Sequence, residues 1–148
     1  MSSPEGSTVT FRHLSADIRP RALLRFARKL QDEVARGRSF DCLITGDSEL
    51  RKLNRQFRRK DYATDVLSFP SGLPATLGDI AISAGRARAQ ARRFGHSTET
   101  EIRVLMLHGV LHLMGFDHET DGGRMARAET RWRTVLRLPT GLIERVRT

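Results

Sequence analysis

The chain has 148 residues, of which 39% are hydrophobic and 29% are charged, a balance typical of a folded globular protein rather than a disordered one. No apolar run approaches the roughly 20 residues that a membrane-spanning helix needs, and residues 1–20 lack the apolar centre of a secretory signal. The 26 basic residues outnumber the 17 acidic ones, and the net charge of +9 favours a polyanionic partner such as nucleic acid. We therefore expect a single domain over residues 1–148 without membrane contact.

The first half of the chain alternates strand-like and helix-like segments. Residues 8–11 favour a strand, and Pro20 suits the first turn of a helix that ends before Gly37. Residues 40–45 favour a second strand. The apolar residues that recur at helical spacing between the two strands are Leu23, Leu24, Ala27, Leu30 and Val34.

The middle of the chain predicts a helix, two short strands and another helix. Asp47 can cap a helix whose inner face carries Leu50, Leu53 and Phe57. The runs DYATDVLSFP and LGDIAIS each contain a short β-like stretch, with proline and glycine between them. Residues 84–94 then favour a helix rich in arginine on a solvated face.

The last part of the chain predicts a buried helix followed by an amphipathic one. Thr98 with Glu101 fits a capping box, and the following segment IRVLMLHGVLHLM is apolar on nearly every side. Gly115 suits the end of this helix, and a last helix is expected over residues 121–138. The order of elements predicts an α+β fold, with helices packed around a small mixed β-sheet.

The segment LHGVLHLMGFDH places three histidines close together. His108 and His112 are four residues apart, so a helix presents both rings on one face at a separation suited to one tetrahedral zinc ion. Gly115 lets the chain leave the helix, and His118 can fold back as a third ligand. Two imidazoles in so apolar a helix would be costly to bury without partners, which favours a metal site on this helix and the loop after it.

Three protein ligands would leave a fourth position for water, as in catalytic zinc sites. The spacing H-x-x-x-H-x-x-G-x-x-H is shared with a class of zinc metalloproteases, whose general base is a glutamate directly after the first histidine. Here that position is Gly109, which cannot transfer a proton. Nearby acids are Glu101, Asp117 and Glu119, of which Asp117 could instead orient a ligand imidazole.

The remaining chemistry-bearing residues carry no predicted function. Cys42 is the only cysteine, so no internal disulfide can form, and we expect a cytoplasmic protein without a disulfide-linked partner. Its surroundings, SFDCLITG, favour a buried core position. His13 and His96 lack the context of the other three histidines, and we interpret both as ordinary surface or loop residues.

Three motifs in this chain resemble those of the YbeY endoribonuclease, or rRNA maturation factor, family. HGVLHLMGFDH resembles the family signature H-G-x-L-H-L-x-G-y-D-H at every fixed position. Upstream, LNRQFRRKDYATDVLSFP resembles the segment L-N-x-x-y-R-x-x-d-x-x-T-D-V-L-S-F-P, and LGDIAIS resembles the strand G-D-I-x-I-S. The three motifs stand in the order of the family and cover most of the chain.

The resemblance implies an α+β domain with a four-stranded sheet and one zinc ion on His108, His112 and His118. It also implies a functional arginine at Arg58, with Arg59 at the next position as the alternative. The family's activity is a single-strand-specific endoribonuclease that acts in 3′-end maturation of small-subunit ribosomal RNA and in ribosome quality control. The expected partners are single-stranded ribosomal RNA and the ribosome or small-subunit assembly factors.

Three functional hypotheses follow. The first is a zinc-dependent endoribonuclease in which Arg58 holds the phosphate through its planar guanidinium. The second is a metalloprotease-like zinc hydrolase, suggested by the shared histidine spacing and opposed by Gly109. The third is a non-enzymatic, metal-stabilised ribosome-assembly factor, suggested by the missing general base.

Overall fold

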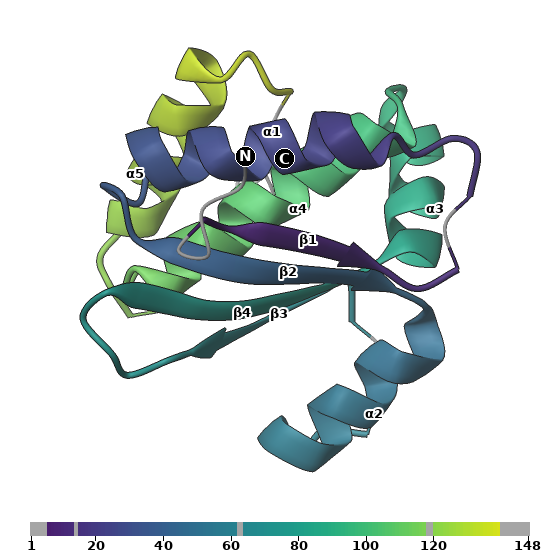
Figure 1. Ribbon diagram of the computed structural model, residues 1–148, viewed down its shortest axis with the longest axis horizontal. Coiled ribbons are helices and arrows are strands. Elements are labelled where there is room, and N and C mark those ends of the chain that lie inside the picture. Colours follow the sequence, from purple (N-terminus) through teal and green to yellow (C-terminus); the bar gives the residue numbers. More distant parts are fainter. Residues whose placement is uncertain (1–5, 14, 62–63, 118–119, 140–148) are drawn as a thin grey trace.

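The computed structural model describes residues 6–13, 15–61, 64–117 and 120–139. They form an α+β fold with a mixed four-stranded sheet, which confirms the predicted class (Figure 1). No helix in these ranges is both long and apolar enough to cross a membrane. The elements in chain order are β1 (Thr8–Phe11), α1 (Pro20–Glu33), β2 (Ser39–Thr45), α2 (Asp47–Arg58), β3 (Val66–Pro70), β4 (Thr76–Ser83), α3 (Ala84–Phe94), α4 (Thr98–Leu113) and α5 (Arg124–Val135).

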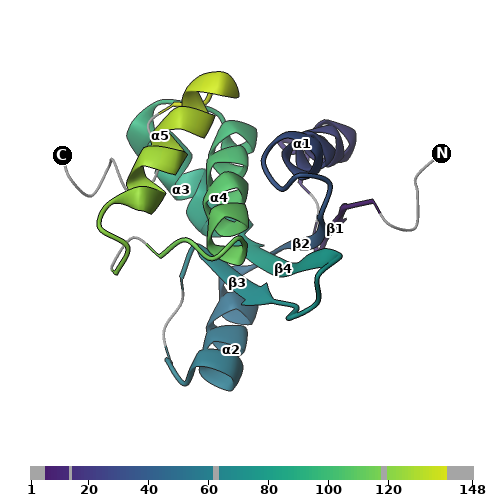
Figure 2. The ribbon, with the colours of Figure 1, turned by 90° about the vertical axis from the view of Figure 1, so that its left-hand side faces the viewer.

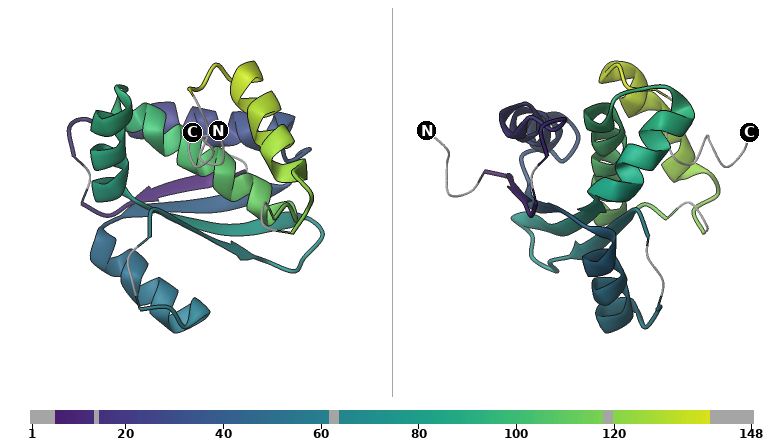
Figure 3. Two further views of the ribbon diagram at one scale, coloured as in Figure 1. Left: turned by 180° about the vertical axis from the view of Figure 1, so that it is seen from behind. Right: turned by 90° about the vertical axis from the view of Figure 1, so that its right-hand side faces the viewer.

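The sheet has the strand order β1-β2-β4-β3, in which the first three strands are parallel and β3 runs antiparallel to β4. Helices α1, α3, α4 and α5 lie on one face of the sheet, whereas α2 lies alone on the other (Figures 1 and 3). Strand β3 is an edge strand, and it lies between α4 on one side and α2 on the other (Figure 2). The edge of β3 is therefore flanked by α4, which packs among other helices, and by α2, which packs alone.

Helix α4 is the buried helix that the apolar run predicted. Most of its residues between Glu101 and Leu113 are buried, because the sheet lies on one side and three helices on the others. The predicted capping box is wrong in its register. Ser97, not Thr98, is the N-cap, and its Oγ accepts a hydrogen bond of 3.1 Å from the backbone N–H of Thr100.

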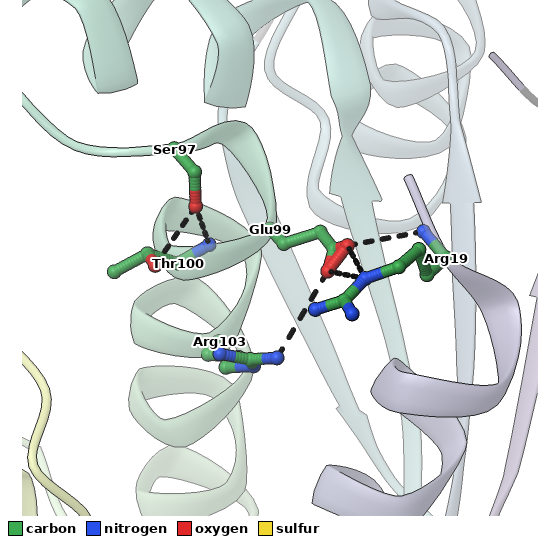
Figure 4. A network of polar contacts seen from close by, with 5 residues as sticks. All are labelled: Arg19, Ser97, Glu99, Thr100 and Arg103. Carbon is green, nitrogen blue, oxygen red and sulfur yellow. Dashed lines mark hydrogen bonds and ion pairs between the residues drawn. The ribbon is translucent and has the colours of Figure 1, made fainter. Parts of the chain in front are cut away.

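A buried carboxylate joins the start of α4 to the start of α1. Glu99 accepts hydrogen bonds from the backbone N–H of Arg19 at 3.2 Å and from its guanidinium Nε at 3.0 Å, and Arg103 lies 3.9 Å away (Figure 4). The hydrogen bonds from Arg19 lower the pKa of the Glu99 carboxyl despite its burial. The network fixes the N-terminal end of α4 relative to the helix that packs beside it.

Three further sequence predictions differ from the structure. Asp47 is the first residue of α2 rather than its cap, and its carboxylate binds Arg86 of α3 at 2.9 Å. The last helix spans Arg124–Val135, because Gly123 before it and the turn after it adopt non-helical backbone. His96 is not an ordinary surface residue, since its Nε2 lies 2.6 Å from a carboxylate oxygen of the buried Glu101.

The apolar residues form two separate clusters. The main core lies between the sheet and the four helices of one face, and it includes Cys42, as predicted. Burial raises the pKa of the Cys42 thiol to about 12, so the thiol is unreactive at neutral pH. A much smaller cluster, made of Leu50, Leu67 and Ala81 with flanking side chains, joins α2 to the opposite face of the sheet.

The absence of a side chain at Gly109 lets α4 approach the sheet closely. A Cβ atom there would lie 3.0 Å from Cγ2 of the buried Ile80 and 3.2 Å from Oγ of Ser68. The Ser68 hydroxyl donates a hydrogen bond of 3.2 Å to the Gly109 carbonyl oxygen. Gly109 therefore sets the spacing between α4 and the two strands beneath it.

We expect Gly109→Glu to lower the free energy of unfolding by about 3 kcal/mol or more, because it overpacks the core and buries a carboxylate. The same change at Gly85 is the matched control. Gly85 is exposed in the first turn of α3, and the nearest atom to an added Cβ is 3.9 Å away. Gly85→Glu should leave the stability unchanged or raise it by up to about 1 kcal/mol. Urea unfolding of both variants measures the difference, and equal stabilities would contradict this packing.

Candidate functional site

A cleft of about 390 Å³ follows the outer edge of β3 and contains the predicted site residues from two sides. Helix α2 supplies Asn54 and Arg58, and helix α4 supplies His108 and His112. Residues 64–68 and Pro70 form the wall between the helices. Figure 2 shows the three elements that carry these residues, with β3 between α4 and α2. Residues separated by 50 positions in the sequence thus meet in one hollow.

The two described histidines of the motif lie together on the cleft side of α4. Their ring centroids are 4.8 Å apart at an interplanar angle of 75°, as expected for residues one helical turn apart. His108 is buried, and His112 is partly exposed. Two imidazoles so placed can bind one divalent ion between them.

A buried carboxylate that the sequence analysis missed lies behind His108. The Oε2 atom of Glu129 in α5 is 2.7 Å from Nδ1 of His108, and both side chains are almost completely buried. Because a carboxylate oxygen accepts, Nδ1 carries the proton, and Nε2 is the nitrogen through which His108 would bind a metal. A carboxylate in this position is the usual partner of a metal-binding histidine.

The sequence does contain a signal for Glu129. It falls on the same face of the predicted last helix as Met125 and Trp132, four residues before it and three after it. An acidic residue on an otherwise apolar helix face needs a buried partner, since an unpaired charge there would be costly. The missing information was the packing of α5 against α4.

The cationic side of the cleft comes from the end of α2. Arg58, the last residue of the helix, lines the cleft together with Lys60. Arg59 has a left-handed backbone with φ of 56°, ends the helix as its C-cap, and is not among the residues that line the cleft. Of the two arginines that the sequence analysis left open, Arg58 is thus the one that faces the described histidines across β3.

The backbone of β3 adds polar groups to the same cleft. The Asp65 carbonyl oxygen accepts a hydrogen bond of 2.9 Å from the N–H of Ser83 in β4. The Ser71 N–H donates one of 2.9 Å to the carbonyl oxygen of Leu77 in β4. Residues of an antiparallel strand alternate in the direction of their backbone groups, so those of Val66 and Ser68 point away from β4. The cleft therefore combines a guanidinium, two imidazoles and an open strand edge.

The other predicted site residues have varied positions. His118 and Glu119 lie outside the described residues, and within the described ranges no cluster of three or more His, Cys, Asp or Glu side chains could hold a metal ion. The ligand triad therefore stays a prediction. Asp117 is exposed in the segment after α4. Glu101 is paired with His96 at the opposite end of the helix from the histidine motif.

Position 109 corresponds to the glutamate of the metalloprotease motif, and its surroundings differ from those of a catalytic base. An added Cβ would point at Ile80 and Ser68 of the sheet. The α4 residues that line the cleft are His108, one residue before this position, and His112, three residues after it. A side chain at position 109 would therefore crowd Ile80 and Ser68.

Comparison with known proteins gives consistent results. A family model described as Endoribonuclease YbeY matches residues 10–136. An Endoribonuclease YbeY from Solibacter usitatus (strain Ellin6076) is 72% identical over 146 residues, which cover 99% of this chain and 99% of the relative. Another from Koribacter versatilis (strain Ellin345) is 56% identical over 103 residues, covering 70% of this chain and 68% of the relative.

The fold has a solved counterpart as well. The solution structure of TM1509 from Thermotoga maritima covers 84% of this chain and 86% of its own, with 27% identity and a TM-score of 0.59. The family resemblance expected from the three motifs is confirmed, because the family model spans most of the chain and the relatives include one nearly full-length match. This chain belongs to the Endoribonuclease YbeY family.

Proposed function

We propose that the protein is a zinc-dependent, single-strand-specific endoribonuclease that cuts RNA in the cleft along β3. The observation that carries the proposal is the meeting of Arg58 with His108 and His112 in one cleft. The relatives are named as endoribonucleases, which supports endonucleolytic cleavage of RNA. We further propose a cytoplasmic role in 3′-end maturation of small-subunit ribosomal RNA and in ribosome quality control, with the ribosome or its assembly factors as partners.

The two imidazoles of the cleft, His108 and His112, are suited to a single zinc ion, for which the sequence motif supplies His118 as the proposed third ligand. The described donors fit in kind, since both are imidazoles, and in arrangement, since Glu129 fixes the proton of His108 on Nδ1. When bound, zinc would supply Lewis acidity that lowers the pKa of water and polarises a phosphate. Three histidine ligands leave room for solvent in the coordination sphere.

The chain's own side chains would hold the substrate. The planar guanidinium of Arg58 can form two parallel hydrogen bonds to the oxygens of one phosphate, and its charge offsets the negative charge that develops during attack at phosphorus. Lys60 adds a second positive charge in the same cleft. The backbone N–H and C=O groups of β3 that point away from β4 can form hydrogen bonds with polar groups of an RNA strand that lies along this edge.

A peptidase activity is disfavoured by the same geometry. The general base of the metalloprotease motif has no counterpart at Gly109, and the sheet occupies the space that its side chain would need. The basic surface, with a net charge of +9, also suits a polyanion better than a peptide. A non-enzymatic role predicts instead that neither the wild type nor the His112→Ala and Arg58→Ala variants cleave RNA.

We expect His112→Ala to abolish cleavage of single-stranded RNA and Arg58→Ala to slow it by about 10²- to 10³-fold. His112→Ala should also lower the zinc content, whereas Arg58→Ala should leave the zinc content unchanged. Arg55→Ala and His13→Ala are the matched controls, since both residues lie outside the cleft lining. Gel analysis of a labelled RNA, with and without chelator, measures cleavage. If cleavage persists in the chelated protein and in both site variants, the proposal is wrong.

We also expect Glu129 to act as a positioning residue for zinc. Glu129→Gln should weaken zinc binding by about 10- to 100-fold, because the amide no longer offers a charged acceptor to Nδ1 of His108. Glu101→Gln is the control, since it changes a similar carboxylate–histidine pair, 2.6 Å across, at the start of α4 and away from the cleft. Competition with a chromogenic chelator measures the zinc affinity. Equal affinities in the two variants would refute the role of Glu129.

A further inference from the structure

The end of α2 exposes an aromatic ring to solvent. Phe57 is 60% exposed, whereas the residues that precede it on the same helix face, Leu50 and Asn54, are buried. Its ring meets that of Phe69 in β3 edge-on, with centroids 5.5 Å apart and an interplanar angle of 64°. An edge-on contact fixes the orientation of the Phe57 ring without covering it.

The ring belongs to the helix that forms the cationic side of the cleft, although Phe57 itself is not among the lining residues. Phe57 directly precedes Arg58 in the last turn of α2, and its partner Phe69 lies between Ser68 and Pro70, which both line the cleft. Lys60, two residues after Arg58, also lines the cleft. An exposed aromatic side chain thus stands among cations beside the proposed phosphate site.

We propose that Phe57 is a stacking platform for an unpaired nucleobase of the RNA whose phosphate is held by Arg58. The inference rests on the proposed function and adds a base-binding subsite to it. Proteins that bind single-stranded nucleic acid combine positive charge along the backbone path with exposed aromatic rings on which bases stack. A base within a duplex has both faces covered by its neighbours, so a single ring of this kind favours unpaired over paired RNA.

A purely structural role for Phe57 makes a different prediction. If the ring served only to extend the small apolar cluster under α2, its removal would affect the stability and would affect all ligands of the cleft alike. Stacking, in contrast, requires a base on the ligand. The experiment therefore removes the ring and the base separately and together.

The ligands are a short single-stranded RNA and an oligomer of equal length and charge in which every residue is abasic. Binding is measured by fluorescence anisotropy in the presence of chelator, which prevents cleavage. Phe57→Ala should weaken binding of the RNA by roughly 5- to 100-fold and leave binding of the abasic oligomer unchanged. Phe57→Trp, which keeps an aromatic ring, should bind the RNA as tightly as the wild type does. Arg58→Ala should weaken binding of both ligands by the same factor.

Phe94→Ala is the matched control. Phe94 is the last residue of α3, is 42% exposed and has Arg93 over its ring at 5.4 Å, yet α3 contributes no residue to the cleft lining, whereas α2 contributes Asn54 and Arg58. It should bind both ligands like the wild type. Equal loss of both ligands in Phe57→Ala, or no loss of either, overturns the stacking role while leaving the role of Arg58 intact. Failure of the wild type to bind either ligand overturns the proposed function and the subsite together.

Discussion

The close packing of α4 on the sheet at Gly109 is the contact on which the rest of the cleft depends. It places the helix directly above Ile80 and next to Ser68, so that His108 and His112 stand beside the edge of β3 rather than above the middle of the sheet. A side chain at this position would push the helix away and open the space between the histidines and the strand. The glycine at position 109 thus leaves the site without a protease-like base and at the same time allows the close packing that places the histidines.

Each side of the cleft is held by a different set of interactions. The histidine side belongs to the main core and is fixed by buried polar contacts, namely the pair of His108 with Glu129 at 2.7 Å and, at the far end of α4, the network around Glu99. The arginine side depends on α2, which packs alone on the opposite face of the sheet (Figure 1). The arginine side and the proposed metal side of the cleft are therefore held by different apolar clusters on opposite faces of the sheet.

Local sequence patterns predicted the elements well, because hydrophobic spacing and proline or glycine positions act over a few residues. The buried α4 and its two histidines followed from the run around IRVLMLHGVLHLM, and the family motifs pointed to Arg58, which lines the cleft. The errors involve long-range partners. Asp47 binds Arg86 instead of capping a helix, His96 binds Glu101, and Glu129 reaches His108 across 21 residues. Such pairings depend on how helices pack, which spacing along one helix does not encode.

The division of the apolar residues into two clusters has a consequence for motion. Helix α2 is held by the small cluster around Leu50, Leu67 and Ala81, whereas α4 is surrounded by the main core. Segments with few buried apolar contacts open at a lower free-energy cost than the core, so we expect the amide hydrogens of α2 to exchange with solvent faster than those of α4. The side of the cleft that carries the guanidinium is thus anchored by less apolar contact than the side that carries the imidazoles.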